Sequence, residues 1–153
     1  MRRFLLFLTI LVSGNASFAQ SAEDSVKTTV NTLFTAMKNA DASLLKSVFA
    51  DSAILQTITR DKEGKLVVRN EDVKEFVDFV GQQKKDVADE RIEFGTIKID
   101  GPLAIVWTPY QFYFSGKFSH CGVNSFQLVR FDNGWKIQYL VDTRRKTGCE
   151  PAK

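Results

Sequence analysis

The sequence predicts an α+β domain in which N-terminal helices pack on one face of a curved, mainly antiparallel sheet. Apolar residues recur at helical spacing mainly in the first half of the chain, whereas long runs with strand-like alternation fill the second half. The pair Asn133-Gly134 separates two of these runs and predicts a β-hairpin. The 13 phenylalanines among 153 residues suit a curved sheet wrapped around an apolar interior. Helices segregated from an antiparallel meander are typical of the α+β class.

The first 19 residues have the pattern of a secretory signal peptide. Arg2 and Arg3 precede an apolar run at positions 4–12, and Ser17-Phe18-Ala19 offers a cleavage site before Gln20. The apolar run has about half of the ~20 residues that a membrane-spanning helix needs. We therefore expect export to the periplasm or the medium, with no membrane segment left after cleavage.

Residues 20–153 are expected to form one domain. Cleavage of 19 from 153 residues would leave 134, a usual length for a domain with a single core, and no repeat or linker divides them. It would also remove two arginines and lower the formal net charge from +3 to +1. So small a charge gives no electrostatic support for binding of nucleic acids.

Two helices are predicted at the start of this domain. The first runs from Glu23 to about Asn39, and Ser21 with Asp24 forms an approximate capping box. The second is short and starts at Asp41, whose carboxylate can cap the amide of Ser43 or Leu44. The inward-facing residues are predicted to be Val26, Val30, Leu33, Phe34 and Met37 in the first helix, and Leu44, Leu45, Val48 and Phe49 in the second.

Two short strands and a third helix follow. The strands are predicted at 53–59 and 66–69, with a polar turn between them. Asn70 is expected to cap the third helix, which extends to about Gln83. The charged stretch 84–90 is interpreted as a solvated connection. The buried stripe of the third helix is predicted to be Val73, Phe76, Val77 and Val80.

Four further strands complete the predicted sheet, at 91–100, 103–114, 117–131 and 135–144. Pro109 cannot donate to a strand ladder and is expected to mark an edge or a bulge. If Asn133 and Gly134 are the two turn residues of the hairpin, Asp132 faces Trp135. The same register then pairs Phe126 with Val141, Leu128 with Tyr139, and Asn124 with Thr143.

The two cysteines, Cys121 and Cys149, are expected to form a disulfide. The hairpin register carries Cys149 back toward Phe118, about three positions from Cys121, and an exported protein meets an oxidising environment. The alternative is that Cys121 is a small buried apolar residue and Cys149 lies on a frayed tail. One histidine and two paired cysteines do not form a recognised ligand set, so no metal is expected.

The order of elements, together with the run HCGVNSFQLVRFDNGWKIQYLVDTRR at positions 120–145, resembles the nuclear transport factor 2-like superfamily. Over Glu23 to Cys149 the chain is most similar to the secreted bacterial branch described as putative lumazine-binding, near the SnoaL-like proteins. The resemblance implies a sheet curled into a cone around the long helix, with an internal pocket at the open end. Members include isomerases, dehydratases, epoxide hydrolases and polyketide cyclases, and also domains that only bind or associate, so the fold does not give the activity.

The residues that enzymes of this superfamily use are missing from the expected places. The isomerases take their general base from the strand after the first helices, but the strand at 53–59 contains no acid or histidine. The first helix has no tyrosine for an oxyanion hole. No motif matches the acid, arginine, acid set of the epoxide hydrolases. No glycine-rich phosphate loop or serine nucleophile motif occurs either, and no cofactor is expected.

The candidate site residues are few. His120 is the only histidine and shares a strand face with Asn124, so both are predicted to line the pocket. Tyr139 lies across the hairpin from them in the predicted register, and Trp107 and Tyr113 are candidate stacking walls. A structural, hydrogen-bonded role for His120, and packing in the core or a dimer interface for Trp107 and Tyr113, are the alternatives.

Three functions remain open. The first is an exported domain that binds a small apolar or aromatic molecule in the pocket without catalysis. The second is an isomerase, dehydratase or cyclase with His120 as acid or base and Asn124 or Tyr139 as oxyanion donor. The third is an interaction module that forms a homodimer through its open sheet face. Asp142 falls on the opposite strand face from Tyr139 and Val141, and a salt bridge or dimer contact explains it as well as catalysis does.

Overall fold

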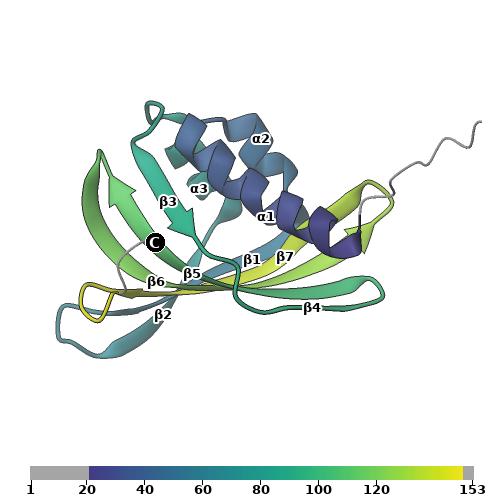
Figure 1. The fold of residues 1–153 in the computed structure, drawn as a ribbon. Coiled ribbons are helices and arrows are strands. Elements are labelled where there is room, and N and C mark those ends of the chain that lie inside the picture. Colours follow the sequence, from purple (N-terminus) through teal and green to yellow (C-terminus); the bar gives the residue numbers. More distant parts are fainter. Residues whose placement is uncertain (1–20, 150–153) are drawn as a thin grey trace, which may run out of the picture.

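The structure is a computed structural model that describes residues 21–149. Within this range a seven-stranded sheet curves around three helices that cover one of its faces (Figure 1). The predicted α+β class and the predicted position of the helices are confirmed. The predicted signal peptide at residues 1–19 lies outside the described residues. None of the helices in the described part is long and apolar enough to cross a membrane.

Helix α1 (Ala22–Asn39) begins and ends as its sequence predicts. The Ser21 hydroxyl accepts a hydrogen bond from the Asp24 amide, which caps the first turn. Ala40 adopts a left-handed conformation with φ of 56° and ends the helix. The predicted inward-facing residues are all buried: Val26, Val30, Leu33, Phe34 and Met37.

Helices α2 (Ala42–Ser47) and α3 (Val73–Gly81) are capped by aspartates. The Asp41 carboxylate accepts a hydrogen bond from the Leu44 amide, as predicted. Helix α3 is capped by Asp72, whose carboxylate accepts from the Glu75 amide, so the prediction of Asn70 as the cap was wrong. The reason is that strand β2 (Leu66–Glu71) continues past Asn70 and delays the start of the helix.

The sheet has the order β2-β1-β7-β6-β5-β3. Strand β4 pairs with the first residues of β5, which β3 leaves unpaired. Strands β1 and β7 are parallel, and the other neighbours are antiparallel. The remaining bounds are β1 (Phe49–Arg60), β3 (Ala88–Ile92), β4 (Ile97–Asp100), β5 (Leu103–Phe114), β6 (Lys117–Phe131) and β7 (Gly134–Arg145).

The stretch 84–90 is not entirely a solvated connection. Strand β3 begins at Ala88, which is buried, and includes Glu90. The predicted strand at 91–100 is instead split into the end of β3 and the whole of β4. The split lies beside Pro109, whose carbonyl accepts from the Glu93 amide. Pro109 therefore sits at an irregularity, as its missing N–H predicts.

The β6–β7 hairpin has a different register from the predicted one. Asp132 and Asn133 form the turn, Phe131 faces Gly134, and Gly134 alone takes a positive φ, of 107°. Next to the turn the pairing is thus two residues away from the predicted register, and an irregularity between Gln127 and Leu128 reduces the difference to one residue along the rest of the hairpin. Because a one-residue shift moves side chains to the other face of a sheet, this register decides which residues of β7 point inward.

The core lies between the helices and the concave face of the sheet. Phe126, Leu128 and Ile137 are completely buried there, and the rings of Phe34 and Phe126 meet edge to face at 6.2 Å. A disulfide joins Cys121 in β6 to Cys149 after β7. This is the expected pairing of the two cysteines.

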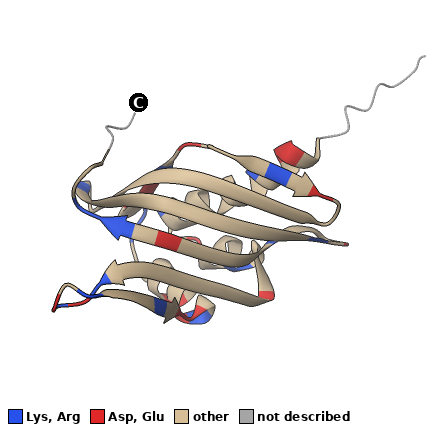
Figure 2. Cartoon of the chain, turned by 90° about the horizontal axis from the view of Figure 1, so that it is seen from below, with Lys and Arg blue, Asp and Glu red and all other residues tan. Residues whose placement is uncertain are grey.

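The outer face of the sheet is open in the part of the chain that the structure describes. Its strands carry few charged residues away from their ends (Figure 2). Trp107, Ile105 and Ile54 are 49%, 43% and 51% exposed on this face. Two rows cross β5, β6, β7 and β1 there: Ile105, Gln127, Tyr139 and Ile54 in one, and Trp107, Ser125, Val141 and Gln56 in the next.

Candidate functional site

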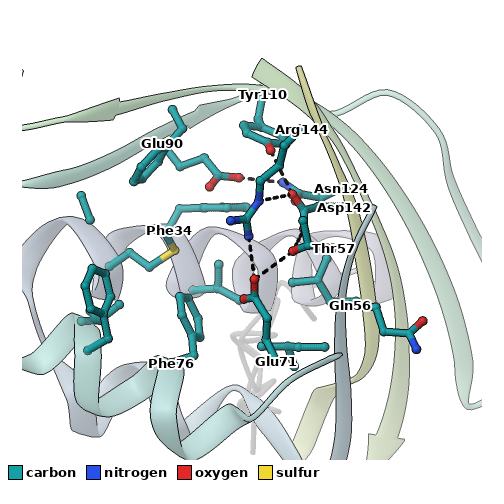
Figure 3. Close-up of a pocket in the computed structure, with 18 of the residues that line it drawn as sticks. Phe34, Gln56, Thr57, Glu71, Phe76, Glu90, Tyr110, Asn124, Asp142 and Arg144 are labelled. Atoms are coloured by element: carbon teal, nitrogen blue, oxygen red, sulfur yellow. Dashed lines mark hydrogen bonds and ion pairs between the residues drawn. The ribbon is translucent and has the colours of Figure 1, made fainter. Parts of the chain in front are cut away.

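A cavity of about 490 Å³ lies between the helices and the concave face of the sheet. Its walls are mainly apolar and come from α1, α3 and β5. A group of polar and charged side chains from six strands, all but β4, meets at one end (Figure 3). The largest apolar wall residues include Leu33, Phe34 and Met37 of α1, Phe76 and Val80 of α3, and Phe112 of β5.

Asp142 is the centre of the polar group. Its carboxylate accepts hydrogen bonds from the Tyr110 hydroxyl at 3.0 Å, the Thr57 hydroxyl at 2.5 Å and Arg144 Nε at 2.9 Å. The side chain is almost fully buried. The observed register pairs Asp142 with Asn124 and so turns it inward, whereas the sequence analysis placed it on the other face from the pocket. That placement was wrong because the hairpin register is shifted.

Arg144 connects Asp142 to a second carboxylate. Its Nη2 lies 3.1 Å from Glu71 Oε1 at the end of β2. The three residues form an acid, arginine, acid set that no local motif reveals, because Glu71 comes from a strand far away in the sequence. Burial by itself would lower the pKa of Arg144. The charge of Asp142 and its hydrogen bond to Arg144 together outweigh burial, so the net pKa is raised and the guanidinium stays charged.

Glu90 faces this group from β3. Asn124 Nδ2 donates a hydrogen bond of 2.8 Å to Glu90 Oε1. Burial raises the pKa of Glu90 to about 7, and the negative charge of Asp142 adds to the increase, while the bond from Asn124 and the charge of Arg144 oppose it. At neutral pH both the protonated and the ionised forms of this carboxyl group are therefore populated.

Tyr110 completes the polar end of the cavity. Its hydroxyl lies 3.0 Å from Asp142 Oδ2 and also 3.0 Å from the Thr143 carbonyl oxygen. Burial raises the pKa of Tyr110, as do the nearby charges of Asp142 and Glu90, so the phenol remains a hydrogen-bond donor. Gly122 makes this approach possible, because a Cβ there would lie 1.7 Å from the Thr143 oxygen and 2.8 Å from the Tyr110 ring.

His120 lies at the side of the cavity among aromatic rings. Its ring centroid is 5.1 Å from that of Phe112 and 5.7 Å from that of Tyr110, and Nδ1 is 3.0 Å from the Ser119 hydroxyl. Burial lowers the pKa of His120, and the positive charge of Arg144 lowers it further. The imidazole is therefore neutral at pH 7 and can exchange hydrogen bonds with a molecule in the cavity.

Of the predicted site residues, His120 and Asn124 line the cavity, while Trp107, Tyr113 and Tyr139 do not. Trp107 and Tyr113 are odd-numbered residues of β5, and the inner face of this strand carries even-numbered residues such as Tyr110. Tyr139 pairs with Gln127 on the outer face and donates its hydroxyl to Gln56. The expectation that these three residues line the pocket is corrected by the observed registers.

Glu71 and Glu90 were not predicted as site residues. Glu71 was hidden because the predicted strand at 66–69 ends before it. Glu90 was hidden because the predicted strand at 91–100 begins after it. The alternation of Ala88, Glu90 and Ile92 was a usable signal, because it places the carboxylate on the same strand face as two apolar residues.

Metal binding has no support from the described residues. Within 21–149, no three His, Cys, Asp or Glu side chains are placed to hold a metal ion together. The two cysteines are joined to each other. The arrangement can instead form hydrogen bonds at one end of an apolar cavity through Asn124 and Tyr110, and exchange a proton there through Glu90.

The chain is similar to one described protein family and to several solved structures. The family model described as putative lumazine-binding matches residues 21–139. A nuclear transport factor 2-like protein of unknown function from Methylobacillus flagellatus KT is 17% identical, with 84% of this chain and 96% of that chain covered and a TM-score of 0.63. A domain of unknown function with a cystatin-like fold from Nostoc punctiforme PCC 73102 is 18% identical, with 83% and 79% covered and a TM-score of 0.63.

A third structure, a nuclear transport factor 2-like protein of unknown function from Shewanella baltica OS155, is 12% identical, with 82% and 94% covered and a TM-score of 0.62. At these identities the likeness shows the fold and leaves the activity to the site itself. None of the curated proteins matches the chain.

Proposed function

Because the chain belongs to the putative lumazine-binding family of the nuclear transport factor 2-like superfamily, we propose that it is a small-molecule-binding domain whose cavity holds an organic ligand with an apolar or aromatic body. One observation carries this proposal: a cavity of about 490 Å³ has apolar walls and a few convergent polar groups at one end. Sites for small molecules typically combine these two features at this size.

The two ends of the cavity give the ligand an orientation. The apolar body would lie against Phe34, Phe76 and Phe112, where burial of each square ångström of apolar surface contributes about 25 cal/mol. A polar group of the ligand would meet Glu90 and Asn124 at the other end. Because Glu90 titrates near neutral pH, it can act as a donor or an acceptor toward that group.

Native mass spectrometry of the mature protein from an exported preparation tests the proposal. We expect a discrete added mass on the folded chain that is lost on denaturation. The variant Asn124→Leu, which removes an inward polar group, should lose most of this mass, whereas Ser125→Ala on the outer face of the same strand should retain it. Identical masses before and after denaturation would count against a tightly held ligand.

A second candidate is an enzyme of isomerase, dehydratase or cyclase type. It is favoured by the carboxyl group of Glu90, whose pKa of about 7 in an apolar cavity suits proton transfer. His120 lines the same cavity as a further acid or base. Asn124, the candidate oxyanion donor, also lines it, whereas Tyr139 does not. If the bound molecule is isolated and returned to the protein in D₂O, an enzyme should exchange its acidic C–H protons, and Glu90→Gln should slow this exchange at least about tenfold.

We also propose that the domain forms a homodimer through its outer sheet face. Trp107, Ile105 and Ile54 are about half exposed there, in two adjacent rows that cross four strands. A second copy could cover this face with the same apolar residues, as an isologous contact requires. Exposed apolar surface of this extent is typical of interaction sites.

Export of the protein remains our proposal, and the disulfide between Cys121 and Cys149 supports it. Disulfides persist in oxidising compartments and are rare in the cytosol. Amino-terminal sequencing of the protein recovered outside the cytoplasm should begin at Gln20. An intact residue Met1 in that fraction would contradict cleavage at the predicted site.

A further inference from the structure

The residues around the cavity carry an excess of negative charge. Five carboxylates line it, two of them on the exposed first turn of α3 at the mouth, and Arg144 is the one basic side chain among its lining residues. The lowered pKa of His120 keeps that ring neutral at pH 7. A cleft lined by one sign of charge concentrates ligands of the opposite sign. The carboxylates belong to Glu71, Asp72, Glu75, Glu90 and Asp142.

Several hydrogen-bond donors of the polar end are already in use. Arg144 directs Nε and Nη2 at Asp142 and Glu71, and Tyr110 donates to Asp142 or to the carbonyl of Thr143. Asn124 donates through Nδ2 to Glu90 Oε1. Within the described residues, Glu90 Oε2 and Asn124 Oδ1 have no hydrogen bond. The group therefore leaves acceptors free for a ligand.

We propose that the ligand carries a cationic head, such as a protonated amine or amidine, which Glu90 Oε2 and Asn124 Oδ1 accept while the apolar body fills the cavity. This inference rests on the proposed binding function and names the class of ligand for the same site. The carboxylates of Asp142 and Glu71 favour the cation over longer distances, and Arg144 neutralises only part of their charge. A carboxylate ligand would instead meet like charges in a partly desolvated space.

Binding of such a cation is coupled to the ionisation of Glu90. The groups that face Glu90 are Tyr110 from β5, His120 and Asn124 from β6, and Asp142 and Arg144 from β7. The nearby lysine of α1, Lys38, pairs with Asp89 instead, at 3.1 Å. A cation beside Glu90 lowers the pKa of its carboxyl group, so the protein releases a proton as the cation binds.

Three probes of nearly equal shape separate charge from size: 2-naphthylmethylamine as the cation, 2-naphthalenemethanol as the neutral molecule and 2-naphthoate as the anion. Isothermal titration calorimetry of the full mature protein at about pH 8 should give Kd values in this order, with the cation at least about tenfold tighter than the anion. An anion that binds as tightly as the cation, or better, would overturn the inference.

Variants and measurements of proton release test whether Glu90 and Glu71 cause the preference for the cation. Glu90→Gln and Glu71→Gln should each reduce the ratio of cation to anion affinity by several-fold, whereas Glu63→Gln in the β1–β2 turn should leave it unchanged. At pH 7, titrations in two buffers of different ionisation enthalpy should show release of a fraction of a proton with the amine. Glu90→Gln should release none, and an unchanged ratio in this variant would reject Glu90 as the acceptor.

The outcomes keep this inference apart from the proposed function. If a molecule travels with the folded protein in native mass spectra but proves neutral or anionic, the binding function stands and the cationic class is wrong. If the molecule is an organic cation, both stand. If the folded protein carries nothing and none of the three probes binds, both are rejected.

Discussion

Asn124 and Glu90 are joined across strand β5, because the Asn124 amide of β6 donates a 2.8 Å hydrogen bond to the Glu90 carboxylate of β3. The two strands are not neighbours in the sheet, since β5 lies between them. Their side chains meet on the concave face, close to Tyr110 and Asp142 (Figure 3). This contact places an ionisable group in an apolar cavity, and the first prediction follows from it.

Glu90 makes the stability of the protein depend on pH. Its pKa rises from an ordinary value of 4.5 to about 7 in the folded state. The folded state therefore binds more protons than the unfolded state between these values, and the free energy of unfolding falls as the pH increases from about 4.5 to about 7. The loss is about 3 kcal/mol at most. Urea denaturation across this range should show that Glu90→Gln removes the decrease, while the exposed Glu93→Gln keeps it.

Asp142 is expected to be the most costly carboxylate of the site to remove. Asp142→Ala leaves Thr57 and Tyr110 without their shared acceptor and Arg144 without its closest counter-ion. We expect a loss of about 2 kcal/mol in the free energy of unfolding, because three hydrogen bonds to a charged group are lost, while Thr57 and Arg144 keep Glu71 and Tyr110 keeps the Thr143 carbonyl. Chemical denaturation measures this loss, with Asp132→Ala in the exposed hairpin turn as control. Equal stabilities of the two variants would contradict the central role of Asp142.

Gly122 is expected to tolerate no side chain. A Cβ at this position would lie 1.7 Å from the Thr143 carbonyl oxygen, so Gly122→Ala must separate β6 from β7 locally. We expect a loss of about 2 kcal/mol or more, together with displacement of the Tyr110 hydroxyl. Thermal unfolding measures the first effect, and a shift in tyrosine absorbance measures the second. Gly64→Ala also puts a side chain at a glycine, but in a turn with open space around it, and it should leave the tyrosine absorbance unchanged.

The proposed homodimer should depend on Trp107. A charge in place of this half-exposed indole would be buried without a partner at the interface, so Trp107→Glu should shift the protein to monomers in sedimentation velocity experiments. Phe79→Glu introduces the same charge at an equally exposed aromatic residue of α3 and should leave the dimer intact. A monomeric wild-type protein at high concentration would reject the proposal.

The disulfide between Cys121 and Cys149 is expected to stabilise the end of the sheet. It closes a loop with a sequence separation of 28 residues, for which the loss of chain entropy in the unfolded state corresponds to about 3.6 kcal/mol. Reduction should therefore lower the melting temperature of the wild-type protein. The melting temperature of a Cys121→Ser, Cys149→Ser double variant should not change on reduction. The unreduced mass should be about two hydrogens below the reduced mass, and equal masses would show free thiols instead.

Much of the fold could be predicted from local patterns. The caps Ser21 and Asp41 and the buried stripe of α1 are where helical spacing and side-chain chemistry place them. Strands β5 and β6 also have the predicted bounds, since turn residues flank each of them. These features depend on neighbouring residues in the chain, so a single sequence is enough to identify them.

The candidate site was predicted only in part. His120 and Asn124 were placed in the pocket by strand alternation, and both line the cavity. Tyr139 was placed beside them through a register that differs from the observed one, and the same register placed Asp142 on the opposite face. Glu90 escaped notice because charged neighbours made its strand look like a solvated loop.

The sequence by itself determined the helices, most of the strands, the existence of the hairpin and the pairing of two cysteines, because each of these follows from periodicity, turn chemistry or the count of one residue type. Only the tertiary structure decided which carboxylates meet in the cavity. Glu71, Glu90 and Asp142 come from three separate strands, and their positions depend on pairing registers in which a shift of one residue moves every side chain to the opposite face. Register is set by contacts distant in the sequence, and local patterns do not contain that information.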